Sequence, residues 1–419
     1  MRKMIDSGVE WLGAIPQDWD LVQIKSIASC KSEKSSYIGG AYIGLEHIES
    51  GSGKLLADGS QTGIEVDSTV SSFSDTDILF GKLRPYLAKA AKPNFDGQCS
   101  TEILVLNPSS RIQKDFLFWY LLNPAFIDAV NASTYGAKMP RANWNFIGSC
   151  YLPLPPMNMQ TVISSVLNEK FAQVDTLIAN VQAQIEKLKA YKQSVITEVV
   201  TKGLDPTVPM KDSGVEWIGE ISAHWGVTRI KNMFELRNER NDEADLTKVN
   251  LISLYTDLGV VQHSDLTATT GNRAVTAEGY KIVRKNDIVV NIILCWMGAV
   301  GMSQYDGVTS PAYDIYRPLK DTNSEYYHYL FRTNRFNGEC YRYGRGIMMM
   351  RWRTYSTEFR AINIPCPPAE EQKKIVAHLN EKCNKIDQLI AIKQAKIEKL
   401  EQYKRSLIYE YVTGKREVV

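Results

Sequence analysis

The chain has 419 residues and carries 49 lysines and arginines against 47 aspartates and glutamates, which gives a formal net charge of +2. This length exceeds what one ordinary core can hold, so two or more domains are expected. Hydrophobic residues make up 44% of the chain and charged residues 23%, which excludes a disordered protein and leaves any nucleic-acid binding to local patches of charge.

An internal repeat frames the chain. The first element is Asp6-Ser7-Gly8-Val9-Glu10-Trp11-Leu12-Gly13, which returns 206 positions later as Asp212-Ser213-Gly214-Val215-Glu216-Trp217-Ile218-Gly219. Residues 155–201 return 212 positions later as residues 367–413, with about half of them identical. Between these anchors the two halves share few residues, so we expect one scaffold that carries two related but diverged globular parts.

Each globular part is predicted to be α+β with a mixed sheet. Short β-rich runs bounded by Gly, Asn and Asp indicate strands, and longer periodic runs indicate helices. The predicted strands are 42–45, 78–80, 103–106, 250–254 and 288–294, and the predicted helices include 114–122 and 324–333. We place the first globular part at residues 1–153 and the second at residues 204–364.

A long helix is predicted after each globular part, at residues 154–203 and 365–419. The apolar residues of both segments recur in alternating steps of three and four, which is the seam of a coiled coil. About 40 residues per helix correspond to a length of about 60 Å. We therefore predict two antiparallel helices that join the globular parts, in a pseudo-twofold repeat whose two termini lie close together.

Lys192 and Lys404 interrupt the two seams at the same place, where a polar residue can fix the register of the helices or face a partner. A pair of helices buries only its seam, so side chains beside the seam could form a docking face for another subunit. The candidate partner-binding residues are Tyr191, Ile196, Tyr403 and Ile408.

The strongest chemical signal is an arginine-rich stretch between residues 332 and 360, with aromatic residues interleaved and only two glutamates. Arginine binds phosphate and pairs with guanine, and aromatic rings pack against sugars and bases. A solvated charged surface is the alternative, which the scarcity of acidic partners disfavours. The candidate DNA-binding residues in this stretch are Arg342, Arg345, Arg351, Trp352 and Arg353.

The matching segment of the first part is less charged but rich in groups that can read base edges, asparagine being the natural partner of adenine. Its candidates are Lys138, Arg141, Asn143, Trp144 and Asn145, with Trp144 predicted to correspond to Trp352. A second candidate surface contains Lys82, Arg84 and Tyr86. In the second part, Arg273 and Arg284 fit an ordinary surface as well as they fit DNA contact.

No catalytic residue and no metal site is predicted. Asn123-Pro124-Ala125-Phe126 is similar to a motif of adenine methyltransferases, but no glycine-rich cofactor loop follows a strand upstream. The five histidines show no metal-ligand spacing, and the seven cysteines form no Cys-x-x-Cys pair, which argues against a structural zinc and a disulfide framework. Because we find no signal peptide and no apolar stretch long enough for a membrane span, we expect a cytoplasmic protein.

Four motifs together resemble the specificity subunit of type I restriction-modification systems. They are the repeated Asp-Ser-Gly-Val-Glu-Trp element with Ile15-Pro16-Gln17-Asp18-Trp19 behind it, Phe80-Gly81-Lys82-Leu83-Arg84-Pro85-Tyr86, Ser310-Pro311-Ala312-Tyr313, and Pro367-Pro368-Ala369-Glu370-Glu371-Gln372. The resemblance covers essentially the whole chain. One departure is Met157-Asn158-Met159-Gln160, which lacks the acidic pair and so puts the capping of the first long helix in question.

The resemblance implies two target recognition domains, each reading half of an asymmetric, bipartite site in double-stranded DNA. The helices would set the spacing and dock two methyltransferase subunits, which would bring S-adenosylmethionine. Two restriction subunits would add ATP- and Mg²⁺-dependent translocation and cleavage, while this chain would bind no cofactor and no membrane. The alternatives are a self-sufficient DNA methyltransferase and a coiled-coil scaffold that binds protein instead of DNA.

Overall fold

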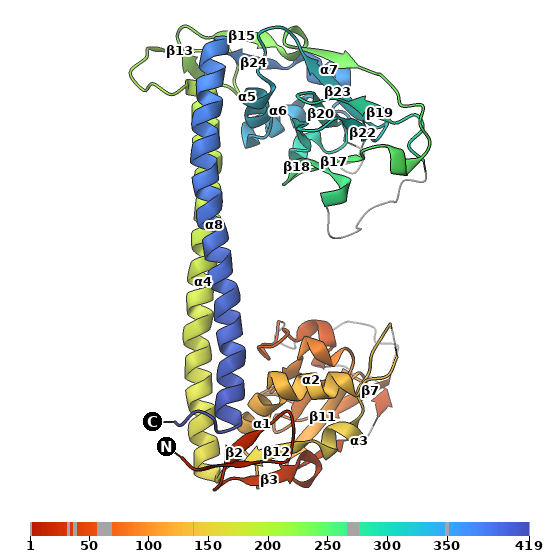
Figure 1. The fold of residues 1–419 in the computed structure, drawn as a ribbon, viewed down its shortest axis with the longest axis vertical. Coiled ribbons are helices and arrows are strands. Elements are labelled where there is room, and N and C mark those ends of the chain that lie inside the picture. Colours follow the sequence, from red (N-terminus) through yellow and green to blue (C-terminus); the bar gives the residue numbers. More distant parts are fainter. Residues whose placement is uncertain are drawn as a thin grey trace. The chain divides into compact units, whose positions relative to one another are not determined.

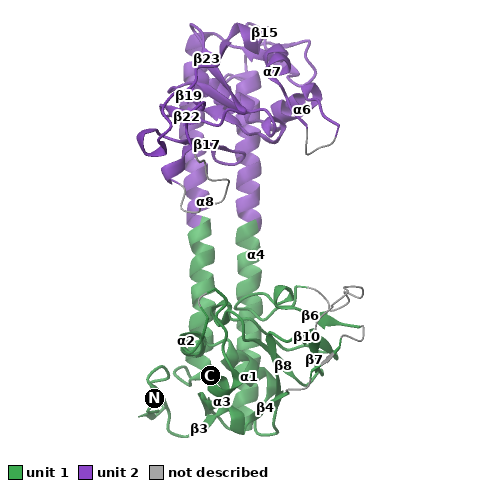
Figure 2. Ribbon diagram, turned by 90° about the vertical axis from the view of Figure 1, so that its right-hand side faces the viewer, with its two compact units in different colours: residues 1–182, 393–419 green, residues 183–392 purple. Residues whose placement is uncertain are grey.

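The two longest elements are α4 (Met157–Lys202) and α8 (Ala369–Val412), which lie side by side in the computed structural model (Figures 1 and 2). Each starts directly after a pair of prolines, which cannot continue a preceding helix. Each is followed within two residues by a glycine of positive φ, Gly203 at 87° and Gly414 at 70°. The prediction of two long helices that pack on each other is confirmed.

The chain divides into two compact units, each of which combines one globular part with one half of each long helix (Figure 2). Unit 1 contains residues 1–182 and 393–419, and unit 2 contains residues 183–392. The structure describes residues 2–31, 34–36, 40–56, 69–136, 138–265, 276–347 and 352–418. The four boundaries expected from the sequence stay predictions, since the compact units cut across both long helices.

Unit 1 is an α+β assembly. Its strands are β1 (Met4–Asp6), β2 (Ala14–Pro16), β3 (Asp20–Gln23), β4 (Ala28–Lys31), β5 (Ser35–Ser36), β6 (Tyr42–Ile43), β7 (Thr69–Phe73), β8 (Ile78–Gly81), β9 (Ala90–Ala91), β10 (Gly97–Ser100), β11 (Ile103–Pro108) and β12 (Tyr151–Leu154). Its shorter helices are η1 (Ile24–Ser26), η2 (Leu45–His47), η3 (Pro85–Leu87), α1 (Lys114–Leu121), α2 (Pro124–Ala132) and α3 (Trp144–Ser149). The central sheet has the order β4-β11-β8-β9 and is antiparallel, and a second sheet, β5-β7-β10-β6, is mixed because β10 and β6 are parallel.

Unit 2 repeats the central sheet of unit 1 but not its mixed second sheet. Its strands are β13 (Met210–Asp212), β14 (Glu220–Ser222), β15 (Gly226–Arg229), β16 (Phe234–Arg237), β17 (Ile252–Tyr255), β18 (Gly259–Gln262), β19 (Lys281–Val283), β20 (Ile288–Asn291), β21 (Val300–Met302), β22 (Gly307–Thr309), β23 (Tyr313–Pro318) and β24 (Asn363–Cys366). Its shorter helices are η4 (Ile230–Asn232), η5 (Leu246–Lys248), η6 (His263–Asp265), η7 (Cys295–Met297), α5 (Ser324–Phe331), α6 (Asn334–Tyr343) and α7 (Ser356–Ala361). The sheet order β16-β23-β20-β21 matches β4-β11-β8-β9, and each strand and helix predicted from the sequence overlaps an observed one.

Each half of the helix pair packs against the globular part of its own unit. In unit 1, the rings of Phe171 in α4 and Trp119 in α1 lie 4.4 Å apart between centroids. In unit 2, the fully buried Tyr326 of α5 donates its hydroxyl hydrogen to the carbonyl of Val200 in α4, 2.7 Å away. Burying such a side chain contributes about 1.5–3 kcal/mol, so these contacts fix each helix half to its globular part.

The same glutamine fastens the start of each long helix. Gln160, 1% exposed, accepts a hydrogen bond from the backbone N–H of Gln113 and donates one to the carbonyl five residues before it. Gln372, also 1% exposed, accepts a hydrogen bond from the backbone N–H of Asn323 and donates one to the carbonyl of Pro367, five residues before it. The missing acidic pair at the start of α4 therefore leaves this contact intact.

An ion pair crosses between the long helices in each unit. Lys404 of α8 lies 2.7 Å from Asp175 of α4 in unit 1, and Lys192 of α4 lies 2.6 Å from Asp387 of α8 in unit 2. Asp387 and Lys404 follow Asp175 and Lys192 by 212 positions each, so the two ion pairs are equivalent under the repeat. Lys192 and Lys404, which interrupt the two seams, therefore each bind an acidic residue of the opposite helix. Such a contact can fix the register of the two helices.

The two termini meet in unit 1, as the near-circular repeat predicts. The backbone N–H of Arg2 donates to Glu417 at 2.9 Å, and the Lys415 ammonium donates to the carbonyl of Leu12 at 2.6 Å. In the part of the chain that the structure describes, no helix has the length and apolar character needed to cross a bilayer.

Candidate nucleic-acid interface

In unit 1, the chain between α2 and α3 forms a loop closed by a two-residue β-bridge. The backbone groups of Tyr135 and Arg141 exchange two hydrogen bonds, of 3.2 and 3.1 Å, and residues 135–141 are called here the first bridged loop. This loop is fastened to the segment that follows β8. The N–H of Arg84 donates to the carbonyl of Pro140 at 2.8 Å, and that of Ala142 donates to the carbonyl of Lys82 at 2.9 Å.

This arrangement brings together the two candidate surfaces that the sequence suggested for the first part. Arg84, Tyr86, Lys138 and Asn145 are exposed, and Lys82 is half-buried beside them in the chain. Arg84 has a left-handed backbone (φ 51°), and its guanidinium makes no ion pair with any described residue. The exposed cations therefore remain available for a ligand.

Other candidates of unit 1 are engaged within the protein. The Arg141 guanidinium binds both carboxylate oxygens of Glu102, with a shortest distance of 3.0 Å, and these hydrogen bonds raise the pKa of Arg141. The side-chain oxygen of Asn143 accepts the N–H of Phe146 at 2.9 Å and so caps α3. Trp144 is half-buried against Gly148. These three side chains hold the loop and the start of α3 in place.

Unit 2 has the same junction with different side chains. The backbone groups of Arg345 and Arg353 exchange hydrogen bonds of 2.8 and 2.9 Å, and residues 345–353 are called here the second bridged loop. The N–H of Thr354 donates to the carbonyl of Ile292 after β20, as Ala142 does to Lys82 after β8. Arg351 lies outside the described residues.

The predicted correspondence between Trp144 and Trp352 is wrong. Trp144 is the first residue of α3, whereas Trp352 lies before α7 in the second bridged loop, which is two residues longer than the first. The Trp352 ring stacks on Tyr341 with centroids 5.0 Å apart and an interplanar angle of 22°, and its indole N–H donates to the Tyr341 carbonyl at 3.0 Å. Trp352 thus braces one side of the loop against α6.

Several arginines of the arginine-rich stretch form internal contacts. Arg332 donates to four backbone carbonyls, those of Gly298, Val300, Thr256 and Asp257. Arg342 binds Glu339, which raises the pKa of the arginine, and Arg345 binds Glu358 at 2.7 Å while its side chain stays 74% exposed. Arg353 makes no ion pair with a described residue. Among the described residues, the ends of the second bridged loop therefore carry one exposed arginine, Arg345, and one half-buried arginine, Arg353.

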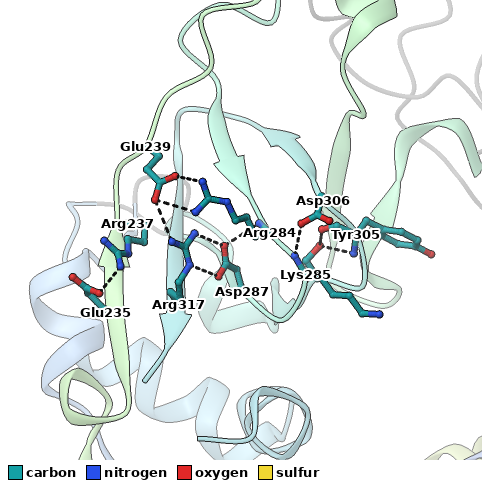
Figure 3. A network of polar contacts seen from close by, with 10 residues as sticks. Glu235, Arg237, Glu239, Arg284, Lys285, Asp287, Tyr305, Asp306 and Arg317 are labelled. Carbon is teal, nitrogen blue, oxygen red and sulfur yellow. Dashed lines mark hydrogen bonds and ion pairs between the residues drawn. The ribbon is translucent and has the colours of Figure 1, made fainter. Parts of the chain in front are cut away.

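Arg284 lies apart from this loop. It belongs to the turn before β20, whereas the loop is fastened to Ile292 at the other end of that strand. Figure 3 shows Arg284 bound to Glu239, which also binds Arg317, while Arg317 binds the buried Asp287. Arg284 is therefore part of an ion-pair network that links neighbouring strands, and Arg273 lies outside the described residues.

Sequence reasoning missed the exposed apolar residues of the two loops, Met139 (46% exposed) and Ile347 (95% exposed). A signal was present, since each stands in a glycine-containing segment next to basic residues. Among the described residues, no group of three or more histidine, cysteine or acidic side chains could hold a metal ion. Both bridged loops carry cationic and aromatic side chains, which can bind the phosphate backbone and the bases of a nucleic acid.

The candidate partner-binding residues separate into two kinds. Tyr191 and Tyr403 are 48% and 42% exposed. Ile196 and Ile408 are only 9% and 2% exposed and belong to the hydrophobic cores of units 2 and 1. Of these four candidates, only the two tyrosines are therefore exposed enough to contact another subunit.

The chain matches the family described as "Type I restriction modification DNA specificity domain" twice, over residues 16–187 and 223–402. It is 28% identical over 243 residues to the type I restriction enzyme EcoDI specificity subunit of Escherichia coli, a match that spans 57% of this chain and about half (49%) of that relative. It is 23% identical over 444 residues to the type I restriction enzyme MjaVIII specificity subunit of Methanocaldococcus jannaschii, covering 96% of this chain and 93% of the relative.

Two solved structures share the fold at 16% identity. One comes from work on complex assembly and conformational transition of the type I R-M system, with a TM-score of 0.71 over 96% of this chain and 99% of the other. The second is the HsdS subunit from Thermoanaerobacter tengcongensis, with a TM-score of 0.53 over 98% of this chain and 100% of the other. Since the two family matches together cover most of the sequence and coincide with its internal repeat, the chain belongs to the non-catalytic DNA specificity subunits of type I restriction-modification systems.

Proposed function

We propose that each unit reads one half of an asymmetric, bipartite site in double-stranded DNA. One observation carries this proposal: the same junction, a bridged loop fastened to the segment after a central strand, recurs in both units with different side chains. Unit 1 offers Lys82, Arg84 and Lys138, and unit 2 offers Arg345 and Arg353. The backbone arrangement is shared, while the cationic side chains that it carries differ, and this supports the reading of two different half-sites by one mechanism.

The long helices are proposed to fix the separation of the half-sites and to dock two methyltransferase subunits. Each ion pair between the helices has an exposed leucine and an exposed tyrosine within one helical turn: Leu177 and Tyr403 near Asp175–Lys404, and Leu389 and Tyr191 near Lys192–Asp387. Isolated apolar side chains are common on surfaces, but this set recurs at equivalent positions of the repeat. Two equivalent surfaces support the binding of two copies of one partner.

The chemistry of the complex would belong to those partners. The methyltransferase subunits would bind S-adenosylmethionine and rotate the target adenine out of the duplex. Two restriction subunits would supply ATP- and Mg²⁺-dependent translocation and cleavage. The role left to this chain is to hold the duplex and select its sequence.

The proposal is tested by expressing the chain together with a methyltransferase subunit of a type I system from the same organism and mapping modified adenines across the host genome. We expect a split, asymmetric motif that disappears when this chain is omitted. A soluble complex that modifies no adenine, together with duplex binding that does not weaken as salt is raised, would support the scaffold alternative instead. Binding of S-adenosylmethionine by the purified chain alone would support the self-sufficient methyltransferase.

A further inference from the structure

The second bridged loop carries an apolar side chain that its own unit does not cover. Ile347 is 95% exposed, more than any other large hydrophobic residue that the structure describes. The first bridged loop has Met139, 46% exposed, between the exposed Lys138 and the half-buried Pro140. Burying an isoleucine is worth about 1.5–3 kcal/mol, so a side chain left this open gains most from a partner that encloses it.

The base of the second loop is held firmly on unit 2. Thr354 is fully buried, and its hydroxyl donates to the carbonyl of Cys340 at 2.9 Å while its N–H donates to Ile292. On the other side Trp352 packs so closely on the backbone that a Cβ at Gly344 would fall 2.1 Å from its indole nitrogen. The exposed isoleucine therefore belongs to a loop whose two ends are held on unit 2, which lowers the entropy lost on binding.

Charge identifies the partner. Arg345 and Arg353 close the loop on either side of Ile347, and the Arg345 side chain is 74% exposed. In the sequence Ile347 is followed by Met348, Met349 and Met350, with Arg345 before this apolar run and Arg351 directly after it. A partner of this loop must therefore complement apolar side chains and several cations together. Duplex DNA offers both complements, because its phosphates pair with arginines while isoleucine or methionine can enter between base pairs.

We propose that Ile347 is a wedge that inserts between two base pairs of the half-site read by unit 2, with Arg345 and Arg353 bound to the flanking phosphates. Met139 takes the corresponding part in unit 1. Unstacking a step costs a few kcal/mol, least at flexible pyrimidine–purine steps, so the wedge makes such a step part of the recognised sequence without a hydrogen bond to either base. This inference rests on the proposed reading of DNA by the two units.

The test uses the full-length chain and a pool of duplexes with a random core of about 20 base pairs, selected by binding at low salt. The enriched duplex is then prepared with 2-aminopurine at successive positions, since the fluorescence of this base rises when it loses a stacking neighbour. We expect wild type and Ile347→Leu to unstack one step of one half-site. Ile347→Ala is expected to lose the signal and to bind about tenfold or more weakly, with an unchanged dependence of affinity on salt concentration.

Leu319→Ala is the matched control, because Leu319 is 41% exposed in the same unit and lies outside the loop. It is expected to behave as wild type, and thermal unfolding shows that Ile347→Ala is folded. Equal unstacking and equal affinity in wild type and Ile347→Ala would overturn the wedge while leaving DNA reading intact. Failure of the wild type to enrich any duplex, with no asymmetric motif among the modified adenines, would remove the proposed function and the wedge with it.

Discussion

The indole nitrogen of Trp225 donates a hydrogen bond to the carboxylate of Glu371 at the start of α8, 3.0 Å away. The equivalent nitrogen in unit 1, that of Trp19, is buried and has no hydrogen-bond partner among the described residues. Met159 takes the place of Glu371 in α4, 212 positions earlier. A buried N–H without an acceptor costs about 1–3 kcal/mol, so unit 1 carries a defect that unit 2 lacks.

The first prediction concerns this acceptor. Glu371→Met should lower the stability of unit 2 by about 1–3 kcal/mol, whereas Glu371→Gln, which keeps an oxygen for the indole, should cost less. Met159→Gln should stabilise unit 1, because it supplies an oxygen for the Trp19 indole. Glutamine is chosen over glutamate because Trp19 is preceded by the acidic Asp18, which would repel a carboxylate, whereas Trp225 is preceded by His224. Hydrogen exchange of the amides around each tryptophan measures both effects, and equal losses in the two Glu371 variants would contradict the explanation.

The second prediction compares the two ion pairs between the long helices. The Lys404 side chain is 7% exposed and that of Lys192 is 29% exposed, while Asp175 and Asp387 are similarly open at 55% and 53%. Removing an acid leaves a cation that is poorly hydrated in unit 1 and well hydrated in unit 2. Asp175→Ala should therefore cost about 1–3 kcal/mol, discounted for the solvent around Asp175 and for a second contact of Lys404 with Glu401, and Asp387→Ala less than about 1 kcal/mol.

Urea unfolding of both single variants, and of each double variant in which the lysine is also replaced by methionine, checks this order. Methionine fills the lysine's space without a charge, so Asp175→Ala/Lys404→Met should recover most of the loss. A larger loss for Asp387→Ala than for Asp175→Ala would show that burial of the lysine does not decide the outcome.

The third prediction is a pH dependence from His328. Burial, with a smaller contribution from the nearby Arg332 charge, lowers the pKa of His328 to about 3, and its Nδ1 accepts the N–H of Met302 at 3.1 Å. The unfolded chain binds this proton near pH 6.5 and the folded chain does not until about pH 3. Stability is therefore retained above pH 6.5 and falls as the pH drops from 6.5 toward 3, by up to about 1.4 kcal/mol per pH unit.

His328→Phe removes the titrating group; phenylalanine stands at the equivalent position of α1, as Phe118. The variant should be less stable at neutral pH, because the N–H of Met302 loses its acceptor. Its stability should also depend less on pH than that of wild type between pH 6.5 and 4. Urea unfolding of unit 2 across this range measures the slope. An identical slope in wild type and variant would mean that other groups cause the acid sensitivity.

The fourth prediction concerns Ala88, which ends η3 with a left-handed backbone (φ 47°, ψ 50°). At the equivalent end of η7 stands Gly298, with φ 90°. A left-handed conformation costs a residue with a Cβ about 1–2 kcal/mol, partly offset by the greater freedom of glycine in the unfolded chain. Ala88→Gly should therefore stabilise unit 1 slightly, and Gly298→Ala should destabilise unit 2, where the new Cβ would also lie 3.2 Å from Asn337. Thermal unfolding of the two variants measures whether each substitution stabilises or destabilises its unit.

Much of this architecture could be predicted because the repeat and the heptad seam are properties of local sequence. The periodicity predicted both long helices, and the shared break at Lys192 and Lys404 indicated a register device. The acidic partners of these lysines, Asp387 and Asp175, could not be predicted. Which residues meet across the two helices depends on how the antiparallel helices are aligned.

The candidate site was predicted less completely. Charge and aromatic content located both bridged loops in the sequence, but composition could not show which cations are already bound. The ion pair of Arg141 with Glu102 joins segments that lie far apart in the chain. The hydrogen bonds of Arg332 to four backbone carbonyls do so as well. The alignment of Trp144 with Trp352 failed because a two-residue difference in loop length has no signature where neighbouring residues have diverged.

The fifth prediction separates reading from support within one loop. Arg84 is exposed without an ion pair among the described residues, whereas Arg141, fastened to the same segment, is bound by Glu102. Arg84→Ala should weaken specific binding by about 1–3 kcal/mol if it contacts a base, and it should change only the half-site read by unit 1. Arg353→Ala is the counterpart in unit 2 and should change only the other half-site.

Arg141→Ala is the control, because it frees Glu102 and loosens the first bridged loop without removing an exposed cation. It should lower the resistance of unit 1 to proteolysis while the recognised sequence stays the same. Mapping of modified adenines in cells that carry each variant gives both half-sites at once. A change in the half-site of unit 2 by Arg84→Ala, or a new sequence preference from Arg141→Ala, would show that the roles of these two arginines had been exchanged.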